Sequence, residues 1–310
     1  MEYYLVGWRL MANLFYCCID GGGSKTQIAL FDGHGRRLGT TITGPTSLSI
    51  NHIKPWDIIY KSLKDLYATL GIELNQFSST DLVIGVAGAN NERLRNQFYR
   101  ESPFDIRSIK IVTDAYIAAL GAHGGSAGSI IIVGTGTIGY TINKTGQQSM
   151  YGGWGFPVGD QGGGAWIGMR ALSFSLKAHE GHLGNLDSEL YRQLIKKCGY
   201  SRNGILEWLN DAGPTEFASL APIVIDCANK GDDFAINLSI EAGFEIEALA
   251  SVMQEANKMP LSLVGGLAEP LTPYLPQSLR TRIKKPVGDP IDGALFIAQG
   301  KAPHETSDWN

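Results

Sequence analysis

The sequence predicts an α/β protein built from two similar halves, and three observations lead to this prediction. Apolar runs rich in β-branched residues alternate along the chain with segments that have the apolar spacing of helices. A unit of strand, glycine turn with a hydroxyl, strand and polar turn occurs twice, around residues 19–26 and around 134–137. The chain has 310 residues, and its hydrophobic content of 44% is ample for two cores. We therefore expect two α/β domains.

The first half is expected to follow the order β-β-β-α-β-α-β-α. Its first long helix ends at Gly71, and its last helix is opened by Asp114 and ended by Gly124 and Gly125. The expected strands cover 14–19, 27–31, 37–43, 81–88 and 109–112, and the expected helices cover 55–70, 90–99 and 115–122.

The second half restarts at Gly128 with the same kind of hairpin. The expected strands cover 129–133, 140–142, 149–151, 262–264 and 280–283, and the expected helices lie over about 163–176, within 185–257, from Gly266 onwards and over 290–298. The polar tail from Lys301 is expected to be loose.

Charge and cysteine usage narrow the class of protein. Thirty acidic residues stand against 26 basic ones, and this formal net charge of −4 argues against a nucleic-acid partner. The cysteines have no C-x-x-C spacing, and two of them lie in an expected buried strand, where cysteine behaves as a small hydrophobe. They are Cys17, Cys18, Cys198 and Cys227. Such sparse usage is typical of the reducing cytoplasm.

Residues 3–19 are largely apolar and raise the question of a targeting segment. Arg9 and Asn13 interrupt this run, no small-residue cleavage site follows, and its end is the strand before the first glycine turn. A signal peptide or a membrane span would consume that strand, so we expect neither. Met11 is an alternative start, which would make residues 1–10 a dispensable extension. We expect a cytoplasmic protein with no membrane partner.

The two glycine turns carry the functional signal. Glycines let backbone N–H groups approach a phosphate closely, and a hydroxyl adds one more donor. Two such hairpins would form a clamp for a nucleoside triphosphate. The second turn also matches G-x-G-x-x-G over 134–139, but the dinucleotide-binding fingerprint requires a helix next, and residues 140–146 predict a strand and a turn.

Three motifs together resemble those of the sugar kinases of the actin-like ATPase superfamily. They are Asp-Gly-Gly-Gly-Ser-Lys-Thr at 20–26, Gly-Thr-Gly-Thr at 134–137 and Gly-Gly-Trp-Gly-Phe-Pro-Val-Gly-Asp-Gln at 152–161. The nearest branch is the N-acetylglucosamine and glucosamine kinases, grouped with the BadF-type ATPases. The resemblance extends from about residue 14 to about residue 300.

This resemblance implies two ribonuclease-H-like domains with the active site in the cleft between them. It also implies ATP and Mg²⁺ as cofactors and an amino sugar as substrate, and many relatives are homodimers. The segment from Pro290 resembles the closing helix that returns to the first domain. The expected domains are therefore 1–113 plus about 290–310, and 114–289.

The resemblance implies nucleotide roles for the glycine turns. Asp20, which could otherwise be a simple turn residue, would face Mg²⁺ directly or through water. Ser24 and Thr137 would donate to the ATP phosphates, and their interpretation as hairpin-turn hydroxyls is compatible with that role. The other implied ATP-binding positions are Gly22, Gly23, Lys25, Ala218, Gly265 and Gly266.

Two interpretations compete for Asp114, which lies where the strand 109–112 meets a helix. The pattern alone favours an N-cap, because aspartate is a preferred capping residue. The resemblance implies instead a catalytic base that contacts the sugar and accepts the proton of its 6-hydroxyl as that oxygen attacks the γ-phosphorus.

The glycine-rich segment 152–164 is expected to be a shaped loop. A ring such as Trp154 and a carboxylate such as Asp160 commonly bind carbohydrate, although Asp160 could cap the next helix and Trp154 could pack. The resemblance implies a sugar pocket lined by Gly153, Trp154, Asp160, Thr135 and Gly136. Ser47 stands where relatives carry an asparagine, and its shorter side chain leaves the identity of the sugar open.

These residues predict an ATP-dependent kinase that phosphorylates N-acetyl-D-glucosamine at O6, with glucosamine as the alternative substrate. One alternative function is an ATPase that activates an acyl-CoA dehydratase, but its iron–sulfur cluster would need cysteines in glycine-flanked loops. Another is a sugar-sensing protein that binds without turnover, which nothing in the sequence requires because both Asp20 and Asp114 are present.

Overall fold

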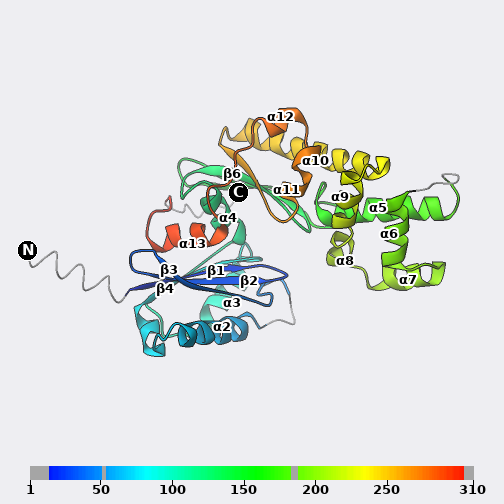
Figure 1. Cartoon of the computed structure of the whole chain (residues 1–310). Coiled ribbons are helices and arrows are strands. Elements are labelled where there is room, and N and C mark those ends of the chain that lie inside the picture. Colours follow the sequence, from blue (N-terminus) through cyan, green and yellow to red (C-terminus); the bar gives the residue numbers. More distant parts are fainter. Residues whose placement is uncertain (1–13, 51–53, 183–187, 304–310) are drawn as a thin grey trace, which may run out of the picture. The chain divides into compact units, whose positions relative to one another are not determined.

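The computed structural model describes residues 14–50, 54–182 and 188–303 (Figure 1), and the structural statements below concern these residues. The proposed extension 1–10, the alternative start at Met11 and most of the tail expected to be loose lie outside them. Within the described ranges, no helix combines the length and the apolar composition needed to cross a membrane.

The chain divides into two compact units. The first contains the described residues up to Gly128, the turn Lys144–Gln147 and the described residues from Pro286 onwards, and the second contains Ser129–Asn143 and Gln148–Lys285. The sequence placed the boundary before Asp114. The contacts instead place the helix α4 (Asp114–Ala122) in the first unit, because it packs on α13 and β4.

The described strands of the first unit form one five-stranded sheet in the order β3-β2-β1-β4-β5. β1, β2 and β3 pair antiparallel, whereas β1, β4 and β5 run parallel. Parallel neighbours need a crossover, and the predicted helices after the third and fourth strands supply it. The strands are β1 (Phe15–Gly21), β2 (Thr26–Asp32), β3 (Arg37–Thr43), β4 (Thr80–Val86) and β5 (Ser108–Val112).

Helices lie on both faces of this sheet (Figure 1). α2 and α3 pack on one face, where Ile19 of β1 belongs to the same core as residues of α2, and α4 and α13 lie on the other. The helical elements are α2 (Pro55–Thr69), η1 (Leu74–Ser79), α3 (Glu92–Arg100), α4 and α13 (Pro290–Ala298).

The face on which Asp20 lies follows from strand geometry. Asp20 is paired in register with Gly85 of β4. A Cβ atom at Gly85 would overlap the side chain of Ile117 in α4, so this position faces α4. Since paired residues of neighbouring strands point to the same face and successive residues to opposite faces, Asp20 faces α4 and Ile19 faces α2.

α4 and α13 cross at very close range. A Cβ atom at Gly121 would overlap the carbonyl of Asp289, and one at Gly293 would overlap the carbonyl of Ile117. Glycine at both positions therefore lets the two backbones touch. The helix that begins with Asp114 is fixed to the last helix of the first unit.

The described strands of the second unit form a four-stranded sheet in the order β8-β7-β6-β9. β7 and β8 pair antiparallel, and β6 and β9 pair parallel. The strands are β6 (Gly128–Val133), β7 (Thr137–Ile142), β8 (Gln148–Gly152) and β9 (Leu261–Val264). Since β7 directly follows the second glycine turn, the dinucleotide-binding alternative is wrong.

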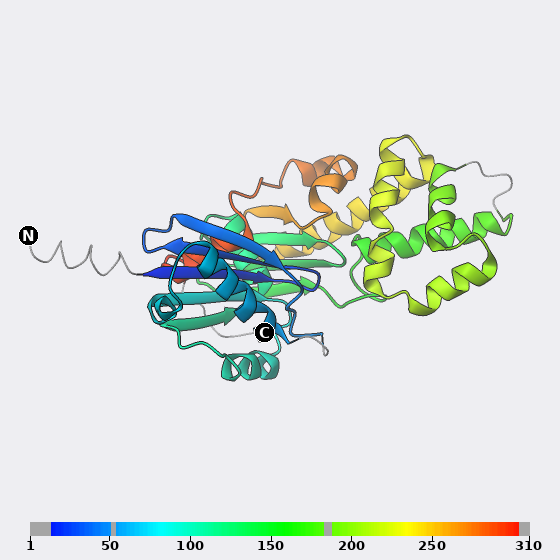
Figure 2. The ribbon, with the colours of Figure 1, turned by 60° about the horizontal axis from the view of Figure 1, so that its bottom comes forward.

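A large helical region accompanies this sheet, and Figure 2 shows its green to yellow helices gathered together. Buried residues of α5, α6, α9 and α10 form one hydrophobic core with β6 and β9. The helical elements are α5 (Gly164–His179), α6 (Glu189–Cys198), α7 (Arg202–Asp211), α8 (Pro214–Ala218), α9 (Ala221–Asn229), α10 (Asp233–Ala256), α11 (Ala268–Leu271), η2 (Thr272–Tyr274) and α12 (Gln277–Arg280).

The last predicted strand, 280–283, is wrong. Pro276 is the N-cap of the short helix α12, in which Leu279 is buried. Arg280 is the last residue of that helix. Only Ile283 reaches the sheet, through an isolated bridge to Leu261. The one apolar residue of the segment 280–283 is therefore explained by this bridge.

Candidate active site

The turn between β1 and β2 is open to solvent. The N–H of Gly22 donates to the carbonyl of Lys25 at 3.0 Å and closes the turn, and Gly23, Ser24 and Lys25 are exposed at its tip. Among the described residues, no hydrogen bond occupies the N–H groups of these three residues. Their N–H groups are therefore available to an anion, as a phosphate site requires.

Asp20 lies inside β1, paired with Gln27, and is therefore not a turn residue. Its carboxylate is half-buried, and no hydrogen bond to it occurs in the described part of the chain. Burial, followed by the negative charges of Asp114 and Asp289, raises the pKa of Asp20 to about 6, while Lys25 opposes the shift. The positive charge of Lys25 compensates this carboxylate only in part, and a bound cation would compensate it further.

The donor chemistry around Asp20 fits Mg²⁺. This ion takes oxygen ligands, keeps several waters and is commonly held by one or two carboxylates together with substrate phosphates. Over the described ranges, no three His, Cys, Asp or Glu side chains are close enough to enclose a metal ion by themselves. The carboxylate of Asp20 could therefore hold Mg²⁺, directly or through water, beside the turn between β1 and β2.

Asp114 is the first residue of α4, but it does not cap the helix. Thr113 is the N-cap, and its hydroxyl accepts the N–H of Tyr116 at 3.1 Å. Asp114 Oδ1 accepts a local bond, from the N–H of Ala115 at 2.9 Å. The capping interpretation of Asp114 is therefore wrong. Burial raises the pKa of Asp114, and the backbone N–H groups at the start of the helix oppose the shift.

Ser47 is buried in the segment that follows β3. Its hydroxyl donates to the carbonyl of Ala87 at 3.4 Å and accepts the N–H of Ser49 at 3.3 Å. Both bonds are long, so a better donor or acceptor from a ligand could compete for the hydroxyl. The side chain is thus held at the carboxyl edge of the sheet, where β1 and β4 also end.

The turn between β6 and β7 is backed by a helix. The N–H of Gly134 donates to the carbonyl of Gly136 at 2.9 Å and closes the turn. The carbonyls of Gly134 and Thr135 accept the N–H groups of Gly164 and Ala165, both at 2.8 Å. The first two residues of α5 therefore bind the turn itself and fix its backbone.

Thr137 is the one predicted phosphate contact that is buried in its own unit. Its hydroxyl has no hydrogen-bond partner among the described residues, and only one other buried side-chain oxygen there, in Ser262, shares this state. An unpaired buried hydroxyl costs free energy, so its presence calls for an explanation. A phosphate oxygen at this position would supply the missing partner.

The structure brings Asp160 together with Gly136, two of the predicted sugar contacts. A Cβ atom at Gly136 would overlap the Asp160 carboxylate, so only glycine allows this approach. Asp160 Oδ1 accepts the N–H of Gly155 at 3.2 Å, and its own φ of +64° lies in the left-handed region. The N-cap of α5 is Gly163, so the interpretation of Asp160 as a helix cap is wrong.

Trp154 is almost fully exposed, at 88%, so the interpretation of this ring as a packed side chain is wrong for its own unit. Its main chain is nevertheless fixed, because the N–H of Gly159 donates to the carbonyl of Gly155 at 2.7 Å and closes a tight turn beside it. Gly153 precedes it with a φ of +68°, against Ile138. The indole is thus presented to solvent from a main chain that is fixed.

The predicted adenosine positions lie around the start of α5. Gly265 has a φ of +99°, and a Cβ atom there would overlap the carbonyl of Val133, so this turn requires glycine. A Cβ atom at Gly164 would lie 3.2 Å from both Ala218 and Leu267, which places α8 and the segment after β9 side by side. Gly266 borders open space. The helix predicted from Gly266 begins at Ala268 instead.

Sequence reasoning missed two residues of the first unit. Asp289, the N-cap of α13, contributes to the raised pKa of Asp20, but in the sequence it reads only as a helix-start residue. Thr46 precedes Ser47 and contacts the turn between β1 and β2. Neither has a distinctive local pattern, and only the fold brings them to the site.

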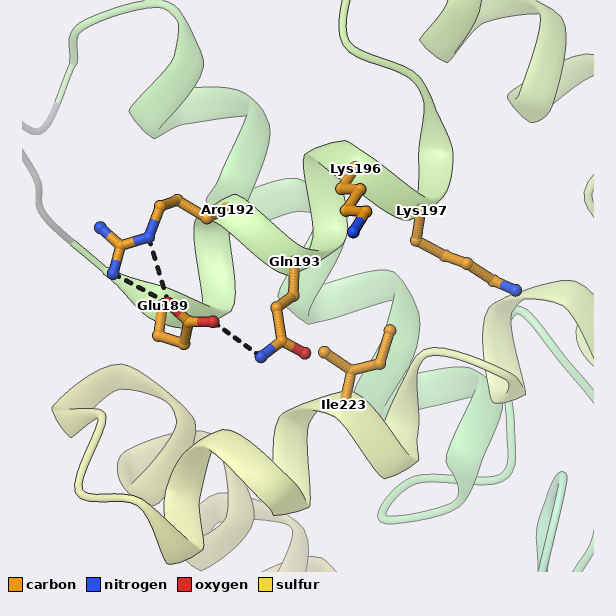
Figure 3. A pocket seen from close by; sticks show the side chains of 6 residues that line it. All are labelled: Glu189, Arg192, Gln193, Lys196, Lys197 and Ile223. Carbon is orange, nitrogen blue, oxygen red and sulfur yellow. Dashed lines mark hydrogen bonds and ion pairs between the residues drawn. The ribbon is translucent and has the colours of Figure 1, made fainter.

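A surface pocket of about 580 Å³ in the second unit is lined by none of the predicted site residues. Its walls come from α6 and from Ile223 of α9. Figure 3 shows that Arg192 and Gln193 both bind the carboxylate of Glu189, at 2.8 and 2.9 Å. Lys196 and Lys197 are exposed, and ion pairs at such a surface contribute little. We assign no function to this pocket.

Comparison with known proteins gives matches over nearly the whole chain. A profile described as the BadF/BadG/BcrA/BcrD ATPase family matches residues 18–298. A glucosamine kinase of Vibrio cholerae is 29% identical over 291 residues, which cover 94% of this chain and 97% of that protein. An N-acetylmuramic acid/N-acetylglucosamine kinase of Clostridium acetobutylicum is 28% identical over 305 residues, with coverages of 91% and 97%.

A solved structure gives the same result. A crystal structure from Chromobacterium violaceum, of a protein provisionally named N-acetylglucosamine kinase, is 32% identical and superposes with a TM-score of 0.85. The match covers 92% of this chain and 99% of that one. Nearly the whole chain is therefore similar, in both its sequence and its fold, to proteins named for kinase activity on amino sugars.

Proposed function

The chain belongs to the BadF/BadG/BcrA/BcrD ATPase family, and from this membership we propose that it is an ATP-dependent kinase that phosphorylates N-acetyl-D-glucosamine at O6. The observation that carries the proposal is Asp114. Its carboxylate is half-buried, its pKa is raised, and the fold does not use it as a helix cap, because Thr113 has that role. A carboxylate kept in this state is suited to act as a general base.

In the proposed reaction, Asp114 accepts the proton of the sugar 6-hydroxyl. The hydroxyl oxygen forms a bond to the γ-phosphorus of ATP, the bond from that phosphorus to the β–γ bridging oxygen breaks, and ADP leaves. Burial disfavours the charged carboxylate, so Asp114 binds the proton more strongly than an exposed aspartate would. Proton transfer in such positions typically contributes about 10²- to 10⁴-fold to the rate.

The phosphates would be bound by both glycine turns. Gly23, Ser24 and Lys25 offer backbone N–H groups, and Thr137 offers the buried hydroxyl. Gly22 would contribute by closing the turn, through its own N–H bond to Lys25. Mg²⁺, when bound, neutralises charge on the transferred phosphoryl group. Asp20 would hold that ion beside the turn, which would explain why its half-buried carboxylate has no hydrogen-bond donor among the described residues.

The sugar would be bound by the loop that contains Trp154 and Asp160. Asp160 has one oxygen on the N–H of Gly155 and lies against Gly136, so its carboxylate is preoriented to accept hydrogen bonds from sugar hydroxyls. The exposed indole of Trp154 would lie on the apolar face of the ring. Thr135, Gly153 and Ser47 are the further contacts proposed.

Glucosamine is the second candidate substrate, because the Vibrio cholerae relative is named for it. The Clostridium acetobutylicum relative is named for two N-acetylated sugars. We favour the N-acetylated sugar because an exposed indole can pack on the acetamide methyl group, which glucosamine lacks. Phosphoryl transfer at O6 is common to both proposals.

An acyl-CoA dehydratase activator and a sugar sensor are weaker candidates. All four cysteines of the chain are buried within strands or helices, at 2% exposure or less, and none lies in a loop that could hold an iron–sulfur cluster. A sensor without turnover would not need Asp114 in a state suited to proton transfer. Anaerobic reconstitution without cluster absorbance would remove the first of these two functions.

The location and assembly are also proposals. Four unpaired cysteines are typical of proteins of the reducing cytoplasm, where we place this chain. The resemblance to dimeric kinases leads us to propose a homodimer, with neither a nucleic acid nor a membrane as partner. Light scattering of the purified chain measures its mass directly.

The test of the proposed function is ADP release with Mg²⁺ and four sugars side by side: N-acetylglucosamine, glucosamine, N-acetylmannosamine and glucose. We expect a clear preference for N-acetylglucosamine, and phosphorus–proton correlation in the NMR spectrum of the product should connect the phosphate to the C6 protons. Flat background with all four sugars would remove the proposal. Preference for glucosamine would correct the substrate and keep the chemistry.

A further inference from the structure

The segment after β3, residues 44–49, lies across the ends of three strands, and we call it the crossing segment. It passes the turn between β1 and β2, which we call the phosphate turn after its proposed role. There the N–H of Thr46 donates to the carbonyl of Gly22 at 3.2 Å. It then reaches the residue after β4, where the N–H of Leu48 donates to the carbonyl of Ala87 at 2.9 Å. The crossing segment therefore connects the phosphate turn with the loop after β4.

Thr46 holds the phosphate turn from both sides. Its backbone N–H binds Gly22 before the tip of the turn, and its hydroxyl lies 2.8 Å from the hydroxyl of Thr26 after the tip. Both threonines are fully buried. The fit is tight, because a Cβ atom at Gly21 would lie 2.5 Å from Thr46 Oγ1. The exposed tip, residues 23–25, is thus fixed at its base by one side chain and one amide.

The next residue, Ser47, is the proposed sugar contact. It bonds the carbonyl of Ala87, which also accepts the N–H of Leu48. The N–H of Ala87 in turn donates to the carbonyl of Gly21 at 2.9 Å. The residue that holds the phosphate turn and the residue proposed to touch the sugar are therefore consecutive and share one hydrogen-bonded network, so a shift of one is transmitted to the other.

We propose that Thr46 is a positioning residue that fixes the phosphate turn relative to the sugar-contacting Ser47, so that bound sugar improves ATP binding at the turn. A turn that is already ordered loses less conformational freedom when it binds phosphate. By reciprocity, ATP improves sugar binding by the same factor. The sugar half of this inference rests on the proposed function, whereas the nucleotide half depends only on the turn.

A purely structural role for the Thr46–Thr26 pair is the alternative, and a matched control separates the two. Ser129 and Thr141 form a second buried hydroxyl pair, also at 2.8 Å, at the end of β6 and β7 opposite the second glycine turn. Thr141→Val removes a hydroxyl from that pair as Thr46→Val does from the first. A structural role predicts the same consequences for both variants.

The first measurement is calorimetric binding of a non-hydrolysable ATP analogue with Mg²⁺ to the full chain, together with Tm. We expect Thr46→Val to weaken binding about tenfold, the scale of one hydrogen bond, and Thr141→Val to change it less than about twofold. Thr46→Ser keeps the hydroxyl and should restore most of the affinity. Equal affinities for Thr46→Val and Thr141→Val would overturn the proposal.

A double variant separates affinity from stability. Replacing both partners of a buried pair by apolar groups of similar shape is nearly neutral for folding, because no hydroxyl is left unpaired. Thr26→Val/Thr46→Val should therefore regain the Tm that Thr46→Val loses, yet still bind the analogue weakly. Recovery of affinity together with Tm would show that the pair only stabilises the fold, and would overturn the proposal.

The second measurement is the KM for ATP at low and at saturating sugar. We expect the wild type to show a lower KM for ATP at saturating sugar and Thr46→Val to show the same KM at both. Wild-type KM values independent of sugar would overturn the coupling. If no sugar supports turnover, the proposed function fails, and the analogue-binding measurement still decides the role of Thr46.

Discussion

The two glycine turns have similar sequences but different structures. The turn between β1 and β2 is exposed at its tip, where Gly23, Ser24 and Lys25 have unoccupied N–H groups within the described residues. The turn between β6 and β7 gives its carbonyls to α5, and its Thr137 hydroxyl is buried without a partner in the described part of the chain. The residue before the first glycine is Asp20 in one turn and Val133 in the other.

This difference shows that the same repeated motif can provide charge in one turn and a fixed shape in the other. The first turn carries charge: within the described residues it has unoccupied backbone donors, a lysine and the carboxylate of Asp20, which we propose holds Mg²⁺. The second turn is equipped for shape, because a helix fixes its backbone and Gly136 admits the Asp160 carboxylate. The repeat in the sequence indicates a duplicated architecture, whereas the neighbours of each turn determine what it can bind.

The largest expected effect comes from Asp114, which belongs to the unit of the first turn. Asp114→Asn should lower kcat by about 10²- to 10⁴-fold, because the amide cannot accept the proton of the attacking hydroxyl. Sugar affinity, measured by calorimetry without ATP, should stay within a few-fold of the wild type. Turnover close to the wild type would remove Asp114 as the base.

Alanine substitution in each turn tests the difference in shape. Gly136→Ala should displace the Asp160 carboxylate and raise the KM for the sugar by about 10- to 100-fold, the scale of a hydrogen bond to a charged group. It should also lower Tm. Gly23→Ala should leave Tm unchanged, because a Cβ atom there meets nothing within 4 Å. Equal Tm values for the two variants would contradict the described packing.

The pH dependence of stability tests the charge of the first turn. The pKa of Asp20 is about 6 in the fold against 3.8 for an ordinary aspartate, so its ionised form destabilises the metal-free protein above pH 6. Asp20→Asn should therefore increase the free energy of unfolding at pH 7.5, by up to about 3 kcal/mol.

This gain should shrink as the pH falls through 6 and vanish near pH 4, where the wild-type carboxyl is protonated in both states. Urea unfolding of both proteins at several pH values, with a chelator present, measures it. Added Mg²⁺ should stabilise the wild type and leave Asp20→Asn unaffected. A gain that does not depend on pH would contradict the assigned state of Asp20.

Removing the hydroxyl from each turn should give the smallest effects. Thr137→Val removes a buried hydroxyl that has no described partner, so Tm should stay equal or rise, whereas the KM for ATP should rise about three- to tenfold. Ser24→Ala should leave Tm unchanged, because Ser24 is exposed. A clear loss of Tm in Thr137→Val would show that the hydroxyl has a partner within the fold.

Most strands and the duplicated hairpin could be predicted because their signals are local. Apolar runs on either side of the two glycine turns predicted β1 and β2 at the first turn and β6 and β7 at the second. The strand expected after Gly139 argued against the dinucleotide-binding alternative. The segment 280–283 was mispredicted because its alternating pattern ends in one apolar residue, Ile283, which makes a single bridge and no continuous strand pairing. Short segments of this kind are settled by their tertiary contacts.

The site was predictable where its residues stand in recognisable motifs, and less so where long-range contacts decide. Thr113 and Asp114 are both good capping residues, and only the geometry assigns the cap to Thr113. Thr46 bonds Thr26 across 20 positions of sequence, and Asp289 affects Asp20 from the far end of the chain. Contacts of this range leave no periodic pattern that a sequence reading can detect.

The crossing of α4 and α13 has a consequence for folding during synthesis. The first unit is made from both ends of the chain, whereas nearly all of the second comes from one stretch between them. During synthesis, the residues of the second unit therefore leave the ribosome before α13 does. Until then the helix that carries Asp114 lacks its cover, and a nascent chain that stalls before Pro290 presents apolar surface of α4 to chaperones and proteases.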